Sequence, residues 1–183
     1  MRRRVIALVA GVLMLAGCGN DANAGTGNHP GAATAGRACQ VIEYDVVAKA
    51  TGTTFDTAGG AQSGDTYTCV LGITGKMFPD LTLAMTPSAI SPIIFIATVR
   101  PSSSLDIDQL GVEAYQATLE PKTAADGTVS GPVLELGWIS ASKRLVFLKY
   151  AFAATATPAD VDAFAPKLVN LAVSIDQVLN AGV

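Results

Sequence analysis

The last segment of the chain constrains the fold most strongly, because it predicts a long helix with one apolar side. Thr157 and Pro158 form a typical helix start, a hydroxyl cap followed by proline, and Asp160 follows three residues after the cap. Apolar residues then recur at helical spacing: Val161, Phe164, Leu168, Leu171, Ala172, Ile175, Val178 and Leu179. Pro166 predicts a kink inside this helix. We expect the apolar stripe to cover a sheet; docking to a partner or to a membrane is the alternative.

The segments before this helix predict the sheet that it covers. Residues 133–139 and 145–152 alternate between apolar and polar positions around a short turn, which is typical of a hairpin. Residues 67–74 and 81–85 alternate in the same way and predict strands with one buried face. Residues 93–99 are rich in β-branched side chains and lie between two prolines, which predicts a strand buried on both faces.

Two more helices are expected from weaker periodicity. Residues 39–51 carry apolar positions at helical spacing and end before Gly52, a typical helix stop. Residues 105–119 predict a middle helix that begins near Asp106. Residues 53–65 are polar and glycine-rich, so we expect a connection there. The order of elements predicts an α+β domain over residues 38–183: an antiparallel sheet of about four to five strands, covered by an N-terminal and a long C-terminal helix, with a middle helix.

The start of the chain predicts export. Arg2 to Arg4 precede a twelve-residue apolar run that ends at Ala16, and Cys18 follows immediately after Gly17. The run is too short to span a bilayer, which takes roughly 20 apolar residues, but it suits a signal peptide over residues 1–17. Leu15-Ala16-Gly17-Cys18 resembles the lipobox of bacterial lipoproteins, which implies cleavage before Cys18 and attachment of acyl chains such as palmitate to its thiol. The alternative is an ordinary secreted protein that is cut near Ala16.

A flexible tether is expected over residues 18–37. The segment holds five glycines and no aliphatic side chain larger than alanine, so it cannot bury enough apolar surface to offset the entropy of ordering. A tether of this length has a root-mean-square span of roughly 25 Å. His29, the single histidine of the chain, lies within it. We interpret His29 as a solvated linker residue, with pH sensing or metal capture as the alternative.

Cys39 and Cys69 are the two cysteines that remain once Cys18 is lipidated. Disulfides persist outside the cytoplasm, so we expect these two residues to pair and to join the first helix to the first strand. Two buried free thiols are the alternative reading. A redox-active pair is disfavoured because the spacing is not Cys-x-x-Cys.

These features together resemble a family, the small cysteine-pair lipoproteins of mycobacteria and related actinobacteria. The resemblance lies in the lipobox, in Ala38-Cys39 followed by Val41-Ile42, in a helix that ends at Thr51-Gly52, and in Cys69 opening a strand after a glycine-rich stretch. Members of that family are largely of unknown function. The resemblance therefore implies an extracytoplasmic location, a lipid anchor in the cell membrane and an α+β fold, and it implies no activity.

The sequence offers no catalytic, cofactor-binding or metal-ligating set of residues. A histidine-based nucleophile needs a positioned histidine, and zinc prefers cysteine and histidine ligands. Gly59-Gly60 lacks the lysine and hydroxyl residue of a phosphate-binding loop. The carboxylate pairs Asp106 with Asp108 and Asp160 with Asp162 are interpreted as helix N-terminal residues; a two-carboxylate hydrolase or a calcium site is the alternative. We predict that the chain is not an enzyme and binds no cofactor.

Composition limits the classes of partner that the chain is expected to bind. The chain has 12 basic and 15 acidic residues, and three of the basic ones lie in the predicted signal peptide. An acidic domain is not expected to bind nucleic acid, which needs basic patches. Besides the membrane that holds the Cys18 anchor, we expect an envelope protein or a lipid as partner. The predicted function is a non-enzymatic interaction module at the outer face of the cytoplasmic membrane. The alternatives are a carrier of an apolar ligand between sheet and helices, and an accessory subunit whose exposed sheet edge pairs with a partner.

Overall fold

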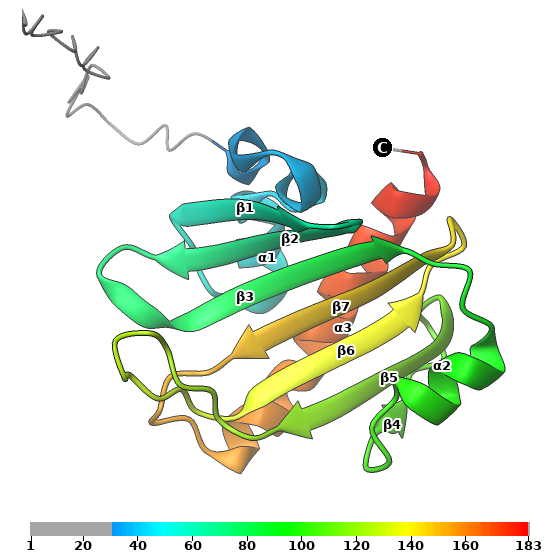
Figure 1. Ribbon diagram of the computed structural model, residues 1–183. Coiled ribbons are helices and arrows are strands. Elements are labelled where there is room, and N and C mark those ends of the chain that lie inside the picture. The colour runs from blue at the N-terminus through cyan, green and yellow to red at the C-terminus, as the bar shows by residue number, and fades with distance from the viewer. Residues whose placement is uncertain (1–30, 183) are drawn as a thin grey trace, which may run out of the picture.

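A seven-stranded sheet forms the centre of the fold in the computed structural model, which describes residues 31–182 (Figure 1). Every pairing is antiparallel, and the spatial order is β1-β2-β3-β7-β6-β5-β4. The strands are β1 (Thr57–Ser63), β2 (Thr66–Ile73), β3 (Lys76–Pro87), β4 (Leu105–Asp106), β5 (Val112–Leu119), β6 (Val133–Ile139) and β7 (Arg144–Ala151). The predicted α+β class with an antiparallel sheet is confirmed, whereas the predicted number of four to five strands is too low.

The long helix α3 (Pro158–Asn180) covers one face of this sheet, which we call the helix face. The side chains enclosed there come from alternate positions of the central strands and from the apolar stripe of α3. The largest of them are Trp138, Leu136, Leu134, Leu148, Leu83, Leu81, Leu71 and Leu168. Each contributes roughly 1.5–3 kcal/mol through burial. The indole N–H of Trp138 also donates to Asp176 Oδ1 at 2.8 Å, which joins β6 to α3.

The start of α3 agrees with its sequence. Thr157 Oγ1 accepts from the N–H of Asp160, and the Asp160 carboxylate accepts from the N–H of Thr157, so both halves of a capping box are present. The hydrogen bonds that the Asp160 carboxylate accepts from the N–H and from the hydroxyl of Thr157 hold the pKa of Asp160 below its usual value. Pro166 lies on the exposed side, and the helix continues past it to Asn180. The β6–β7 hairpin is confirmed as well, with Leu136 opposite Leu148.

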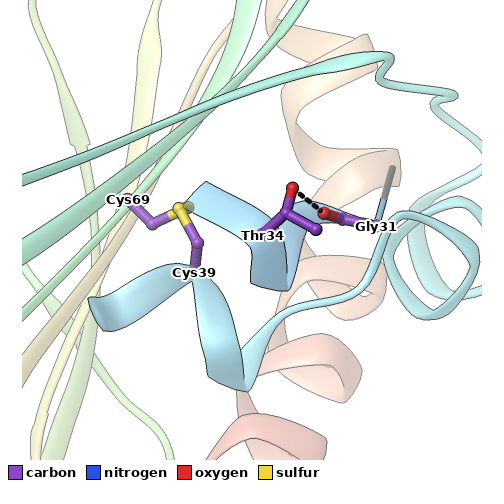
Figure 2. Close-up of a disulfide and its surroundings, with 4 residues drawn as sticks. All are labelled: Gly31, Thr34, Cys39 and Cys69. Atoms are coloured by element: carbon purple, nitrogen blue, oxygen red, sulfur yellow. Dashed lines mark hydrogen bonds between the residues drawn. A yellow bond between two sulfur atoms is a disulfide. The ribbon is translucent and has the colours of Figure 1, made fainter. Parts of the chain in front are cut away.

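The predicted disulfide is confirmed and fastens the N-terminal segment to the sheet. Cys39 of the 3-10 helix η2 (Arg37–Val41) bonds to Cys69 of β2, with 4.9 Å between the two Cα atoms (Figure 2). The helix predicted over residues 39–51 is divided, because Ile42 and Glu43 are extended between η2 and the helix α1 (Tyr44–Thr51). Gly52 ends α1 in the left-handed conformation, as predicted.

The folded body begins earlier than residue 38. A 3-10 turn, η1 (Ala32–Ala35), lies against β1, and Ala32 is fully buried. Small side chains allow this close approach, since a Cβ atom on Gly60 would collide with the carbonyl oxygen of Ala35. The last part of the predicted tether is therefore ordered. The rest of that tether, the predicted signal peptide, Cys18 and His29 lie outside the described residues.

Two assignments in the middle of the chain were wrong. Residues 93–99 form no strand: residues 93–98 belong to the helix α2 (Pro92–Thr98) and Val99 is its C-cap. The hydroxyl of Ser91 caps the start of α2 by accepting from the N–H of Ile94. Pro92, the expected boundary of a strand, is instead the first residue of this helix. Residues 105–119 form no helix but the strands β4 and β5. φ is positive at Gly111, just before β5, and at Glu113, the second residue of β5, and a right-handed helix cannot pass through two such positions.

The polar connection predicted over residues 53–65 contains the edge strand β1. Its sequence, Thr-Ala-Gly-Gly-Ala-Gln-Ser, has neither an apolar alternation nor strongly β-forming side chains, so it carries no strand signal of its own. Pairing with β2 without a break in register makes it a strand. None of the described helices is long and apolar enough to span a membrane.

Candidate interaction surface

The least expected feature of the molecule is the apolar exterior of α2. Ile93, Ile94 and Ile96 are 77%, 51% and 44% exposed, whereas Phe95 between them is completely buried. The helix lies on the face of the sheet opposite α3, which we call the open face, near the end that carries β4 and β5 (Figure 1). We call the surface formed by the three isoleucines the isoleucine surface.

Phe95 fixes α2 to the sheet. Its ring lies 5.8 Å from that of Tyr115 on β5, and both are enclosed with Ala117 and Ile139 in a small second core. Gly137 of β6 makes room for the tyrosine, because a Cβ atom at that position would overlap the Tyr115 ring. The inserted ring of Phe95 therefore packs α2 against the sheet, and the other apolar side chains of α2 are exposed.

A buried polar network lies next to this anchor. The hydroxyl of Tyr115 donates to Glu135 Oε1 at 2.7 Å, and Glu135 Oε2 pairs with Lys149 Nζ at 2.5 Å. Glu135 is only 5% exposed, so both of its oxygens need these partners. Burial, and then the hydrogen bond and negative charge of Glu135, raise the pKa of Tyr115. The hydroxyl therefore stays protonated and acts as a donor that orients the ring beneath α2.

The C-terminal end of α2 is held in place as well. The backbone N–H of Arg100 donates to the carbonyl of Phe95 at 3.1 Å, and Arg100 Nε donates to Ser104 Oγ at 2.8 Å. The guanidinium group also pairs with Asp106 of β4 at 2.5 Å. With a cap at its start, an aromatic anchor and this attachment at its end, α2 presents the isoleucine surface in a fixed orientation.

The predicted carboxylate pairs have different surroundings. Asp160 caps α3 as expected, but Asp106 begins no helix and pairs with Arg100. Asp106, Asp108 and Asp162 all line a groove of about 530 Å³ between the β4 region and α3. Among the residues that the structure describes, no three His, Cys, Asp or Glu side chains form a group that could hold a metal ion.

An apolar groove on the helical side bears on the carrier alternative. It has a volume of about 480 Å³ and lies between the N-terminal segment and the end of α3, where Val41, Val46 and Val178 line it. The space directly between sheet and α3, where a carried ligand was expected, is occupied by Trp138 and the leucines named above. The groove is a surface feature and does not reach into that core.

The sequence did contain a signal for α2. Ser91-Pro92 is the same combination of hydroxyl cap and first-position proline as Thr157-Pro158, which identified α3. The run of β-branched residues between two prolines predicts a strand, and this prediction conflicts with the helix start at Ser91-Pro92. The resulting prediction placed Ile93 and Ile96 inside a sheet rather than on the surface.

Comparison of this chain with protein families, with characterised proteins and with solved structures finds no match. The fold and the disulfide define the class of the molecule, a disulfide-linked α+β domain with a seven-stranded antiparallel sheet. The argument for function therefore rests on the geometry of the described residues.

Proposed function

We propose that this protein is a lipid-anchored component of the cell envelope and acts as a non-enzymatic interaction module, whose isoleucine surface docks onto another envelope protein. The observation that carries the proposal is the exposure of Ile93, Ile94 and Ile96 on a helix that is fixed at both ends. Contiguous apolar side chains on a rigid exterior are typical of an interaction site. Phe95 is the one residue of α2 that is buried, so the fold does not require isoleucine at the outward positions.

The position of the surface favours a protein over the membrane as its partner. The described chain starts at η1, beside β1, whereas α2 covers β5. Five strand spacings separate β1 from β5, which is about 24 Å at roughly 4.8 Å per spacing. An anchor at Cys18 precedes η1, so the tether from that anchor would join the fold at the β1 end of the sheet. The isoleucine surface lies at the opposite end of the sheet from the point where the tether would join the fold, so the attachment leaves it open to other envelope proteins.

Charge supports the same choice. Adsorption to anionic lipid needs free basic side chains next to the apolar ones. Arg100, which follows α2, is engaged by Asp106 and Ser104. The guanidinium group that directly follows α2 in the chain, that of Arg100, is therefore not free to bind a lipid headgroup, which favours an apolar depression on a protein as the docking site.

The partner is tested by photo-crosslinking in intact membranes of the native host. A benzophenone amino acid replaces Ile93 in the full chain, and a matched control carries it at Lys167, an exposed position on α3. We expect one discrete adduct with another protein from position 93, its loss when Ile96→Ser is added, and no such adduct from position 167. Adducts with lipid alone, adducts with a second copy, equal adducts from both positions, or none would each overturn the assignment.

The anchor is tested separately with an alkyne analogue of palmitate. The unsubstituted chain should incorporate the label and remain with the membrane fraction, while Cys18→Ala should abolish labelling and processing. Cys18→Ala leaves Cys39 and Cys69 in place, so the disulfide provides an internal control for folding. Unchanged labelling or membrane retention of the variant would contradict lipidation at Cys18.

The apolar groove beside α3 supports a second candidate, the binding of a lipid or glycolipid. Val41, Val46 and Val178 provide an apolar lining there. Native mass spectrometry of the full protein released from host membranes should then show a bound lipid that is lost in Val46→Asp. Val46 is 46% exposed, so this substitution leaves the core intact. Retention of the lipid by the variant, or its absence from the unsubstituted protein, would exclude this groove as a carrier site.

A further inference from the structure

The apolar groove beside α3 has a rim whose chemistry restricts the head group of a lipid that binds there. The groove lies on the helical side of the molecule, where η2 and α1 contact α3 (Figure 1). Its volume of about 480 Å³ falls within the roughly 300–1,000 Å³ that is usual for small-molecule sites. Val41, Val46 and Val178 belong to its apolar lining, which suits an acyl chain.

One side of the groove is a single stripe along the end of α3. Ser174, Gln177, Val178 and Ala181 line it, and their spacing of three or four residues places them on one face of the helix. The stripe extends over about 10 Å, at 1.5 Å per residue. Polar and apolar side chains follow one another along it, so one ligand can contact both kinds of group.

The polar part of the rim is almost uncharged. It consists of two amides, one hydroxyl and one carboxylate, which belong to Gln40, Gln177, Ser174 and Glu43. Among the residues that line the groove, all of which the structure describes, none is a lysine, an arginine or a histidine. Within the described part of the chain, the side chains of Gln40, Glu43 and Gln177 form no hydrogen bond or ion pair. These side chains are therefore free to bind a ligand.

The electrostatic potential of the groove is negative. Glu43 contributes a carboxylate, and α3 ends at the groove without a basic residue in its last turn, so the negative end of its dipole is uncompensated. Asp45, Lys49 and Asp176 are close in the chain without lining the groove, and together they add one further negative charge. A phosphate group would therefore meet like charge and no basic partner, whereas an uncharged head group would meet no repulsion.

We propose that this groove binds a lipid with an uncharged, hydroxyl-rich head group, such as a glycosyl diacylglycerol, and discriminates against anionic phospholipids. This assignment rests on the second candidate function, lipid binding in the same groove, and adds the class of head group. Sugar hydroxyls donate and accept hydrogen bonds, so they match the amides of Gln40 and Gln177 and can donate to the carboxylate of Glu43. The valines of the groove contact the acyl chain.

Competition between two lipids with identical acyl chains tests the head group. The full chain is released from host membranes in a non-ionic detergent and washed free of its own lipid. It is then mixed with equal amounts of monoglucosyl dioleoylglycerol and dioleoyl phosphatidylglycerol, and native mass spectrometry measures the occupancy of each. We expect at least tenfold more of the glucosyl lipid. Equal occupancy, or an excess of phosphatidylglycerol, would overturn the assignment.

Charge substitutions on the rim provide the controls. Gln177→Lys supplies a basic partner for phosphate and should shift the preference at least tenfold toward phosphatidylglycerol. Ala163→Lys adds the same charge at an exposed position of α3 outside the groove and should leave the preference unchanged. Glu43→Gln should weaken the discrimination without loss of folding, because the Glu43 side chain does not cap α1. An unchanged preference in either folded rim variant, or an equal shift in Ala163→Lys, would contradict the assignment.

Val46→Asp distinguishes failure of this inference from failure of lipid binding itself. If both lipids bind equally and Val46→Asp releases both, the groove is a lipid site and only the head-group assignment is wrong. If neither lipid binds, or if Val46→Asp retains the glucosyl lipid, lipid binding in this groove and the head-group assignment are both wrong. Thermal unfolding of each variant verifies that it is folded.

Discussion

Replacement of Ile93 and Ile96 by serine tests whether these side chains serve docking to a partner or the stability of the fold. Full burial of an isoleucine is worth roughly 2 kcal/mol. About a quarter of Ile93 and about half of Ile96 is removed from water, so the double variant should lose about 1.5 kcal/mol of unfolding free energy. Phe95→Ala removes a completely buried aromatic anchor and should cost about 3–5 kcal/mol. The neighbouring substitutions on one helix thus have clearly different costs.

The assay is urea unfolding of the purified full chain, followed by circular dichroism, together with the position-93 cross-link in membranes. The truncation of an interface anchor typically costs more than 1 kcal/mol in binding, and about 1.4 kcal/mol corresponds to a tenfold loss of affinity. Ile96→Ser alone should therefore reduce the adduct about tenfold with little loss of stability. A loss of 3 kcal/mol or more in the Ile93→Ser/Ile96→Ser variant would show that these side chains are part of the core. An undiminished adduct in Ile96→Ser would show that the isoleucine surface binds nothing.

Three further predictions concern the elements that hold the domain together. Cys39→Ser/Cys69→Ser should lower the unfolding free energy by about 3.5 kcal/mol, because the bond closes a loop with a separation of 30 residues; equal urea midpoints with and without the bond would refute this. Tyr115→Phe removes a donor to buried Glu135 and should cost about 1–3 kcal/mol at neutral pH. Since the pKa of Tyr115 is raised in the folded protein, the stabilisation from its hydroxyl is complete below about pH 10 and is lost as the pH rises further. The unfolding free energy measured from pH 9 to 12 should therefore decline less steeply in Tyr115→Phe than in the unsubstituted protein, and identical slopes would contradict the assignment. Thr157→Ala should cost about 1 kcal/mol by removing the cap of α3, and a thermal midpoint equal to that of the unsubstituted protein would show that the cap is dispensable.

The elements that were predictable are those whose signals are local and mutually consistent. α3 combines a capping box, a first-position proline and an apolar stripe, and every one of these indicates a helix. The β6–β7 hairpin combines alternation with a short turn, and the prediction that Cys18 is lipidated left Cys39 and Cys69 as the expected disulfide. In each case residues near in sequence, or a single possible pairing, determine the outcome.

The elements that were missed depend on contacts between distant residues. β1 is a strand because β2 pairs with it, although its own side chains are small and weakly β-forming. β5 has one face against α2, with Tyr115 and Ala117 enclosed by Phe95, and this alternation is interrupted by a register shift after Val112. Such signals become clear only once the partner element is known.

The candidate surface was missed for a related reason. A run of isoleucines indicates burial on average, and no property of the sequence alone distinguishes a buried run from an exposed one on a helix held by a single aromatic side chain. Ser91-Pro92 identifies the helix start, but the outward direction of Ile93 follows only from the insertion of Phe95 against Tyr115. The lipid anchor at Cys18 remains a prediction from the sequence, outside the described residues.

Amide hydrogen exchange of α2 in three settings tests the docking of the isoleucine surface most directly. The full chain is compared in detergent, in vesicles of phosphatidylglycerol and phosphatidylethanolamine, and in membranes of its own host, with the amides of residues 95–99 as the readout. These amides donate within α2 and open when the helix leaves the sheet. Docking onto an envelope protein predicts slower exchange in host membranes alone. Equal protection in the lipid vesicles, or the same exchange rate in all three settings, would contradict it.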